Sequence, residues 1–265
     1  MTYLSISACT ASTLPAGECD GAPSGDVAQP VSRLVSGDVP PDPSASVLDR
    51  LVRLLLGPLS IGSAIVPLIQ ALLDDGFHPE WLVSRLFVDA ARRLGELWLA
   101  DECTFLDVTI ATQRLGSALV DLETRAPSPP MPAAAGQVLL CPMPGDQHGF
   151  GLSVLGYFLR RAGWDVAAPV MNTATAIEAE VAARGYDIVG LSIGHERAVP
   201  NVADLIRRIR ARSVNPAILV AVGGPMVNQH PEQSARLGAD LWAEDAAAFV
   251  KVLGRSALYT RHNPD

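Results

Sequence analysis

The sequence predicts an α/β protein in which an N-terminal bundle of about four helices is followed by a doubly wound parallel sheet. Two observations predict this class. Apolar residues recur every three or four positions between Val47 and Arg125, as on the buried face of a helix. After a proline-rich break, short continuous apolar runs alternate with helical segments, which is typical of buried parallel strands. The 265 residues are enough for two modest domains.

Composition excludes several classes of function. About half the residues are apolar and the net charge is −8, so strong binding of nucleic acid by this chain alone is not expected. Four scattered cysteines without a CxxC pair predict neither a disulfide framework nor a zinc site: Cys9, Cys19, Cys103 and Cys141. Without a secretory signal or a membrane-length apolar run, we expect a cytoplasmic protein that does not enter a membrane.

Residues 1–45 are rich in Ser, Pro, Gly, Ala and Asp and offer little to bury. This composition predicts a disordered tail. A plain linker and a partner-binding arm both fit it.

Residues 46–125 are expected to form the helical bundle. Gly57 and Pro58 break the first helix, and Pro79 suits the first turn of a later one. Thr104 is placed to cap the last helix, with Asp107 in its first turn where the helix dipole favours an anion. The expected buried stripes are Val83, Phe87, Ala90, Leu94 and Leu97 on one helix, and Val108, Ala111, Leu115, Leu119 and Leu122 on the next.

Residues 126–136 hold four prolines and are expected to be a linker. Residues 137–258 then alternate strand and helix. The runs VLLCPM, WDVAAPVM, DIVGLSIG, AILVAVGG and ADLWA predict about five strands in a Rossmann-like or flavodoxin-like sheet. Ligands in such sheets bind outside the carboxyl ends of the strands.

Polar residues and glycines follow three of these strands. The first strand is followed by PGDQHGFG, with Asp146, His148 and Gly151; the third ends at Ser192; and the fourth ends at Gly223 and Gly224. A carboxylate near one imidazole nitrogen fixes the tautomer and leaves the other nitrogen free as a base or metal ligand. Paired glycines leave a slot without side chains. The sequence therefore predicts one site along this rim.

The DQHGFG stretch resembles the DxHxxG motif of the cobalamin-binding domain family, and VGLSIG and VGGP resemble its later motifs over Gly136 to Gly254. The resemblance implies that His148 binds cobalt from below, with Asp146 and Ser192 tuning that bond. It also implies that Gly151, Gly223 and Gly224 admit the displaced nucleotide tail. Gly194 stands where the motif prefers leucine, which implies a looser groove wall.

The upstream helices resemble the cap that precedes such domains in methionine synthase and in light-sensing regulators. Trp98 is followed by Asp107-Val108, where that cap often has Glu-His. Valine at the histidine position leaves this site without an imidazole above the cobalt. Trp98 is a candidate to pack over the corrin, with ordinary core packing as the equal alternative, and Phe105 is expected in the core.

The acidic tail, variant cap and C-terminal domain together resemble the AerR/PpaA antirepressors of purple photosynthetic bacteria. That resemblance implies a light-responsive regulator that binds adenosyl- or hydroxocobalamin and acts on a DNA-binding repressor of the CrtJ/PpsR type. A corrinoid methyl carrier of a methyltransferase system is the main alternative, and a cofactor-free or haem-binding signalling module is a third. No pair of catalytic base and nucleophile is visible, so we do not expect an enzyme.

Overall fold

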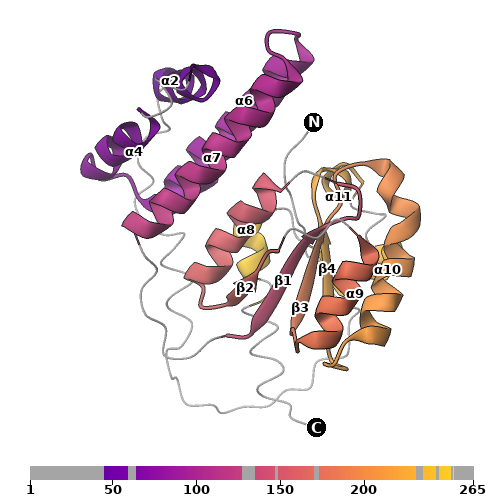
Figure 1. Cartoon of the computed structure of the whole chain (residues 1–265). Helices are drawn as coiled ribbons and strands as arrows, with labels where there is room; N and C mark the ends of the chain where they lie inside the picture. Colours follow the sequence, from indigo (N-terminus) through magenta and orange to yellow (C-terminus); the bar gives the residue numbers. More distant parts are fainter. Residues whose placement is uncertain are drawn as a thin grey trace, which may run out of the picture.

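A computed structural model describes residues 45–58, 64–126, 135–146, 149–169, 173–230, 235–242, 245–251 and 253 (Figure 1). It confirms the expected fold class, a helical cap beside a parallel sheet flanked by helices. The expected tail lies outside the described residues except for Ala45, and the expected linker lies outside them except for Ala126, Ala135 and Gly136.

Antiparallel and crossing helices form the cap and bury the two predicted apolar stripes. Every member of these stripes is buried except Val108, which is half-buried. Pro79 occupies the first turn of its helix, as expected. The helical segments of the cap are α2 (Ala45–Leu56), α4 (Ile65–Asp74), α5 (Pro79–Trp81), η1 (Leu82–Phe87), α6 (Val88–Leu99) and α7 (Phe105–Arg125).

The segment η1 is a π-helix, which the sequence pattern did not predict. It joins α5 to α6 without a break, so Pro79–Leu99 is one continuous helix. Its wide turn still buries Leu82, Val83, Leu86 and Phe87. Such segments are rare and are frequent near functional sites.

Helix α7 starts with the predicted N-cap, which consists of hydrogen bonds between Thr104 and Asp107. The Thr104 hydroxyl accepts a hydrogen bond from the Asp107 backbone N–H at 3.2 Å, and the Asp107 carboxylate accepts one from the Thr104 N–H at 2.9 Å. The Thr104 hydroxyl also donates to this carboxylate at 2.6 Å. These bonds hold the pKa of Asp107 below its usual range. The stability that the N-cap of α7 contributes is therefore fully present above the ordinary carboxyl pKa and is lost as the pH falls through the lowered value.

Replacing Thr104 with alanine is expected to lower the free energy of unfolding by about 1 kcal/mol, because the first turn of α7 loses its acceptor. Urea denaturation followed by circular dichroism measures this loss. The acid-side fall in stability that Asp107 causes should also shrink in the variant. A Thr109→Ala variant is the control, because the Thr109 hydroxyl only donates to the Phe105 carbonyl within the same helix.

The sheet has the strand order β2-β1-β3-β4-β5, and all its described pairs are parallel. The chain moves from β1 to β2 on one side and then returns to β3 on the other side. The carboxyl ends of β1 and β3 therefore flank the topological switch point, where ligands bind in open α/β sheets. The strands are β1 (Gln137–Pro142), β2 (Asp165–Ala167), β3 (Ile188–Ser192), β4 (Leu219–Gly223) and β5 (Leu241–Trp242).

Helices cover both faces of the sheet (Figure 1). One face packs against α8 (Phe150–Arg161) and helical residues 246–251, and the core of the cap continues into this layer. The other face packs against α9 (Ala174–Ala183) and α10 (Val199–Arg212). A short helix that the sequence did not predict, α11 (Pro225–Gln229), follows β4. Among the described helices, none has the length and apolarity needed to span a membrane.

Candidate functional site

The ends of β1, β3 and β4 lie side by side at one rim of the sheet. Pro142 pairs with Ser192, and Ser192 pairs with Gly223. The hydrogen bonds continue past the strands: the Met143 N–H donates to the Ser192 carbonyl at 2.9 Å, and the Ile193 N–H donates to the Gly223 carbonyl at 2.7 Å. The structure thus brings together the three segments that carry the predicted site residues.

Asp146 is one of three polar or charged side chains that are buried among the described residues, with 5% of its surface exposed. Its backbone N–H donates to the Met143 carbonyl at 2.8 Å, closing a turn directly after β1. Its carboxylate occupies the space beside Gly194, where a β-carbon would lie 2.8 Å from Asp146 Cγ. The lack of a side chain at Gly194 thus makes room for this carboxylate, and the expected looser groove wall stays a prediction.

His148 lies outside the described residues, and the chain resumes at Gly149, the N-cap of α8. Gly151, the last residue of the predicted motif, lies in the first turn of α8. Within the described part of the chain, no group of three or more His, Cys, Asp or Glu side chains is arranged to hold a metal. The assignment of His148 as the metal ligand stays a prediction.

Gly224 is required by its backbone. Its φ of 101° lies in the region that favours glycine, and a β-carbon there would lie 2.7 Å from the Ile193 carbonyl oxygen and 3.0 Å from Ser192 Oγ. The chain can therefore turn from β4 into α11 while its backbone lies directly against the segment after β3. This close contact explains why the pair of glycines follows β4.

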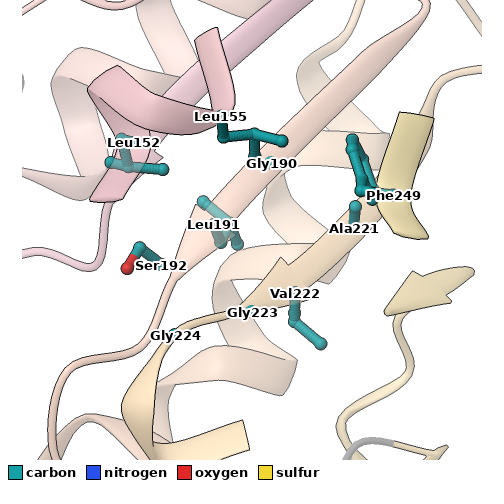
Figure 2. Close-up of a pocket in the computed structure, with 10 residues that line it drawn as sticks. All are labelled: Leu152, Leu155, Gly190, Leu191, Ser192, Ala221, Val222, Gly223, Gly224 and Phe249. Atoms are coloured by element: carbon teal, nitrogen blue, oxygen red, sulfur yellow. The ribbon is translucent and has the colours of Figure 1, made fainter. Parts of the chain in front are cut away.

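A narrow apolar cavity lies directly beside this turn. Figure 2 shows Leu152 and Leu155 of α8 on one side, Phe249 on the other, and the strands β3 and β4 beneath. The lining residues are Leu152, Leu155, Gly190, Leu191, Ser192, Ala221, Val222, Gly223, Gly224 and Phe249. The structure thus places Ser192, Gly223 and Gly224 in one slot, whereas Asp146 and Gly151 do not line it.

The sequence analysis did not predict the other residues that line this slot: Leu152, Leu155, Gly190, Leu191, Ala221, Val222 and Phe249. A signal existed for Gly190, a glycine inside an otherwise apolar strand, which often marks a close approach of another group. A β-carbon on Gly190 would lie 2.8 Å from Leu140 Cδ2, so the absence of a side chain there makes room for Leu140. The apolar face of α8 follows the DxHxxG motif directly, which was the available signal for Leu152 and Leu155.

The slot fits the nucleotide tail of a cobalamin in chemistry but is narrow in size. Its lining is apolar side chains and glycine backbone, which suits a flat heteroaromatic group. Its volume is about 10 Å³, room for about one water molecule. Admitting a tail therefore requires the residues that line the slot to move apart. Ser192, 5% exposed at the end of β3, lies at the slot with a hydroxyl available for hydrogen bonding.

At the tip of the cap, Trp98 is half-buried and stacks edge-on against Phe105, with ring centroids 6.4 Å apart. Phe105 was expected in the core, and this was wrong, because 68% of its surface is exposed. Three other apolar side chains near this tip are exposed as well: Leu99, Leu106 and Ile110. Asp107 belongs to the N-cap of α7, so its carboxylate already accepts hydrogen bonds from Thr104.

Comparison with known proteins shows to which family the chain is similar. The family model described as "B12 binding domain" matches residues 136–251. An uncharacterized 20.5 kDa protein from the bchF-crtJ intergenic region of Rhodobacter capsulatus is 30% identical over 64% of this chain and 89% of its own length. The HTH-type transcriptional repressor CarA of Myxococcus xanthus is 33% identical over 54% of this chain and 50% of its own length.

A solved structure shares the fold. The monomethylamine corrinoid protein of Methanosarcina barkeri superimposes with a TM-score of 0.64 at 17% identity, covering 78% of this chain and 94% of that protein. The likeness extends over the cap as well as the sheet, since the sheet portion alone is less than half of the chain.

Proposed function

We propose, from the premise that this chain belongs to the B12-binding domain family, that it is a light-responsive regulator acting on a DNA-binding repressor of photosystem genes. In this proposal cobalamin, in its adenosyl or hydroxo form, is the sensory group and the partner repressor is of the CrtJ/PpsR type. The chain itself would carry out no catalysis.

The observation that carries the cofactor assignment is the slot beneath the rim, with Ser192, Gly223 and Gly224 in its lining. His148 would hold the cobalt, and the buried Asp146 would orient its imidazole. The slot would take the nucleotide tail between Leu155 and Phe249. When bound, the cofactor would supply a cobalt–ligand bond that light can break. The protein's own residues would exclude water from the tail, and Trp98 at the tip of the cap would pack against the bound cofactor.

Two features favour a regulator over a methyl carrier. The similar Myxococcus protein is named as a transcriptional repressor, and the Rhodobacter relative is named for a position next to crtJ. Val108 also offers no side chain that could coordinate cobalt, and Asp107 is committed to the cap of α7. A cap that ends in Trp98 and exposed apolar side chains is suited to cover a ligand and to present a surface that changes with it.

A His148→Ala variant is expected to lose cobalamin affinity by at least about tenfold, equivalent to about 1.4 kcal/mol, because the cobalt loses its lower protein ligand. Titration of the purified protein with hydroxo- and adenosylcobalamin, followed by absorption spectra after desalting, measures this loss. His195→Ala is the matched control, since His195 is an exposed imidazole near the same rim. An unchanged spectrum and affinity in the His148 variant would remove this residue from the metal.

The regulatory half is tested by light. Illumination of the adenosyl form should change the spectrum and the affinity for the repressor, measured by binding assays in the dark and after a flash. Equal repressor binding in both states, together with methyl transfer from a methylated corrinoid to an acceptor, would replace this proposal with the carrier function.

A further inference from the structure

Two adjacent arginines at the end of α8 connect the sheet layer to the cap. Arg161 Nε lies 2.5 Å from Glu80 Oε1, and the two side chains are only 12% and 10% exposed. Glu80 Oε2 lies 3.1 Å from His78 Nδ1. Glu80 is the one charged residue of the cap among the buried polar and charged residues that the structure describes. A carboxylate this well buried needs a fixed partner.

The second arginine and the second cap helix complete this connection. Arg160 donates two hydrogen bonds to the Glu123 carboxylate, at 2.9 and 3.1 Å. Arg161 Nη1 also donates to the Ala126 carbonyl at the end of α7, at 3.0 Å. The Arg161 guanidinium lies over the buried Tyr157 ring, 5.6 Å from its centroid. We call the group of Glu80, Glu123, Arg160 and Arg161 the α8 joint.

Two helices that meet at the α8 joint, α8 and Pro79–Leu99, carry candidate site residues toward their opposite ends. The first half of α8 lines the slot with Leu152 and Leu155, and the joint lies at its last residues. The continuous helix Pro79–Leu99 carries Glu80 in its first turn and Trp98 at its other end. With a rise of about 1.5 Å per residue, the joint lies roughly 10–15 Å along α8 from the slot and roughly 27 Å along the cap helix from Trp98.

A widening of the slot must therefore act on the joint. The slot holds about 10 Å³, so a nucleotide tail can enter only if α8 moves away from Phe249. A continuous helix of 12 residues moves as a rigid element, which carries its terminal arginines with it. Because the Glu80–Arg161 pair is buried, water cannot replace either partner cheaply, and the cap is held to α8 during that motion.

We propose that Glu80 and Arg161 are positioning residues that make the cap follow α8 when the slot is filled. This inference rests on the proposed cobalamin function, and it deepens that function by naming how the state of the slot reaches Trp98. The other described ion pairs of arginine do not have this arrangement. Arg207–Asp204 and Arg92–Asp89 are exposed pairs within single helices, and Arg208 links α10 to α9 on the far face of the sheet.

Spin labels on the two layers test the proposal. Val120 on α7 and Val214 beyond α10 are both exposed, so cysteines at these positions accept labels without disturbing the core. Cys9, Cys19 and Cys103 are replaced by serine, and the buried Cys141 is kept. Pulsed electron spin resonance then gives the distance between the labels in the full chain, with and without hydroxocobalamin.

We expect a narrow distribution of distances between the labels without cofactor, and an equally narrow distribution with a shifted mean when cofactor is bound. Glu80→Gln and Arg161→Met should broaden the first distribution and abolish the shift, while cobalamin is still retained on desalting. The exchanged pair, Glu80→Arg with Arg161→Glu, should restore a narrow distance and the shift, which a merely stabilising role of either residue would not predict. Arg207→Met is the control and should behave as the unmutated chain.

The proposal is overturned if the single variants keep the narrow distance and the shift of the unmutated chain, or if cofactor binding moves no distance in that chain. If Arg161→Met does not fold, as judged by circular dichroism, Arg160→Met at the more exposed Glu123 pair gives the same reading with a smaller broadening. Failure of the unmutated chain to retain cobalamin overturns the proposed function instead, and the widths measured without cofactor still decide whether the joint positions the cap.

Discussion

Alanine in place of Gly224 is expected to lower the free energy of unfolding by about 2–4 kcal/mol, because left-handed backbone strain and forced overpacking each cost about 1–3 kcal/mol. The φ of 101° and ψ of 175° are accessible almost only to glycine. The added carbon would also lie 2.7 Å from the Ile193 carbonyl oxygen and 2.8 Å from the Ile193 nitrogen. Both neighbours are backbone atoms, so they cannot move aside without shifting β3.

Urea unfolding measures this loss, and cobalamin titration of the folded fraction should show weaker binding because Gly224 lines the slot. Gly238→Ala is the matched control, since Gly238 also has a positive φ, of 78°, but no atom lies within 4 Å of its added carbon. The control should show the backbone strain alone, about 1–2 kcal/mol. Equal losses in the two variants would show that the contact with Ile193 contributes nothing.

A Gly194→Ala variant is expected to weaken cobalamin binding by about 10- to 100-fold, the usual effect of disturbing a group that orients a metal ligand. The new methyl group would occupy the place of the Asp146 carboxylate, whose Cγ lies 2.8 Å from that point. Asp146 would have to leave its buried position, and the imidazole of His148 would lose its proposed orienting partner. Titration with hydroxocobalamin measures the affinity, and the absorption spectrum reports the bond to cobalt.

Gly149→Ala is the control for this experiment. Gly149 lies on the same loop as Asp146, and no atom lies within 4 Å of an added carbon there. Its affinity should stay within about twofold of the unmutated chain. If Gly194→Ala also binds with unchanged affinity and spectrum, the carboxylate of Asp146 plays no part in holding the cofactor.

Periodicity predicted the fold class because the buried stripe from Val83 to Leu97 and the continuous apolar strands are local patterns that tertiary packing reinforced. The cap at Thr104 was predictable for the same reason, since all its hydrogen bonds lie within four residues. The π-helix Leu82–Phe87 was not predictable, because its wide turn still buries one apolar side. The apolar spacing of a helix tolerates one extra residue, so the sequence pattern does not reveal the turn. The helix α11, only five residues long, carries too few positions to show a period.

The candidate site was predictable where a residue type itself reports geometry. Gly224 reports a positive φ, and Ser192 ends a strand that the structure pairs with the first one. What the sequence could not give was the partner of each residue. The placement of Asp146 beside Gly194 and the pairing of Glu80 with Arg161 join positions far apart in the chain, and only the folded packing determines them.

The wide turn at Leu82–Phe87 has a consequence for Trp98. Each residue of an α-helix advances about 100° around the axis, so one residue accommodated in a wide turn rotates everything beyond it by about that angle. The direction in which the indole points is therefore fixed some three turns upstream of the tryptophan itself, in a stretch whose apolar side chains are packed inside the bundle. The number of residues in this buried stretch therefore sets the direction in which the Trp98 ring points. An insertion or deletion there would rotate the far end of the helix about its axis.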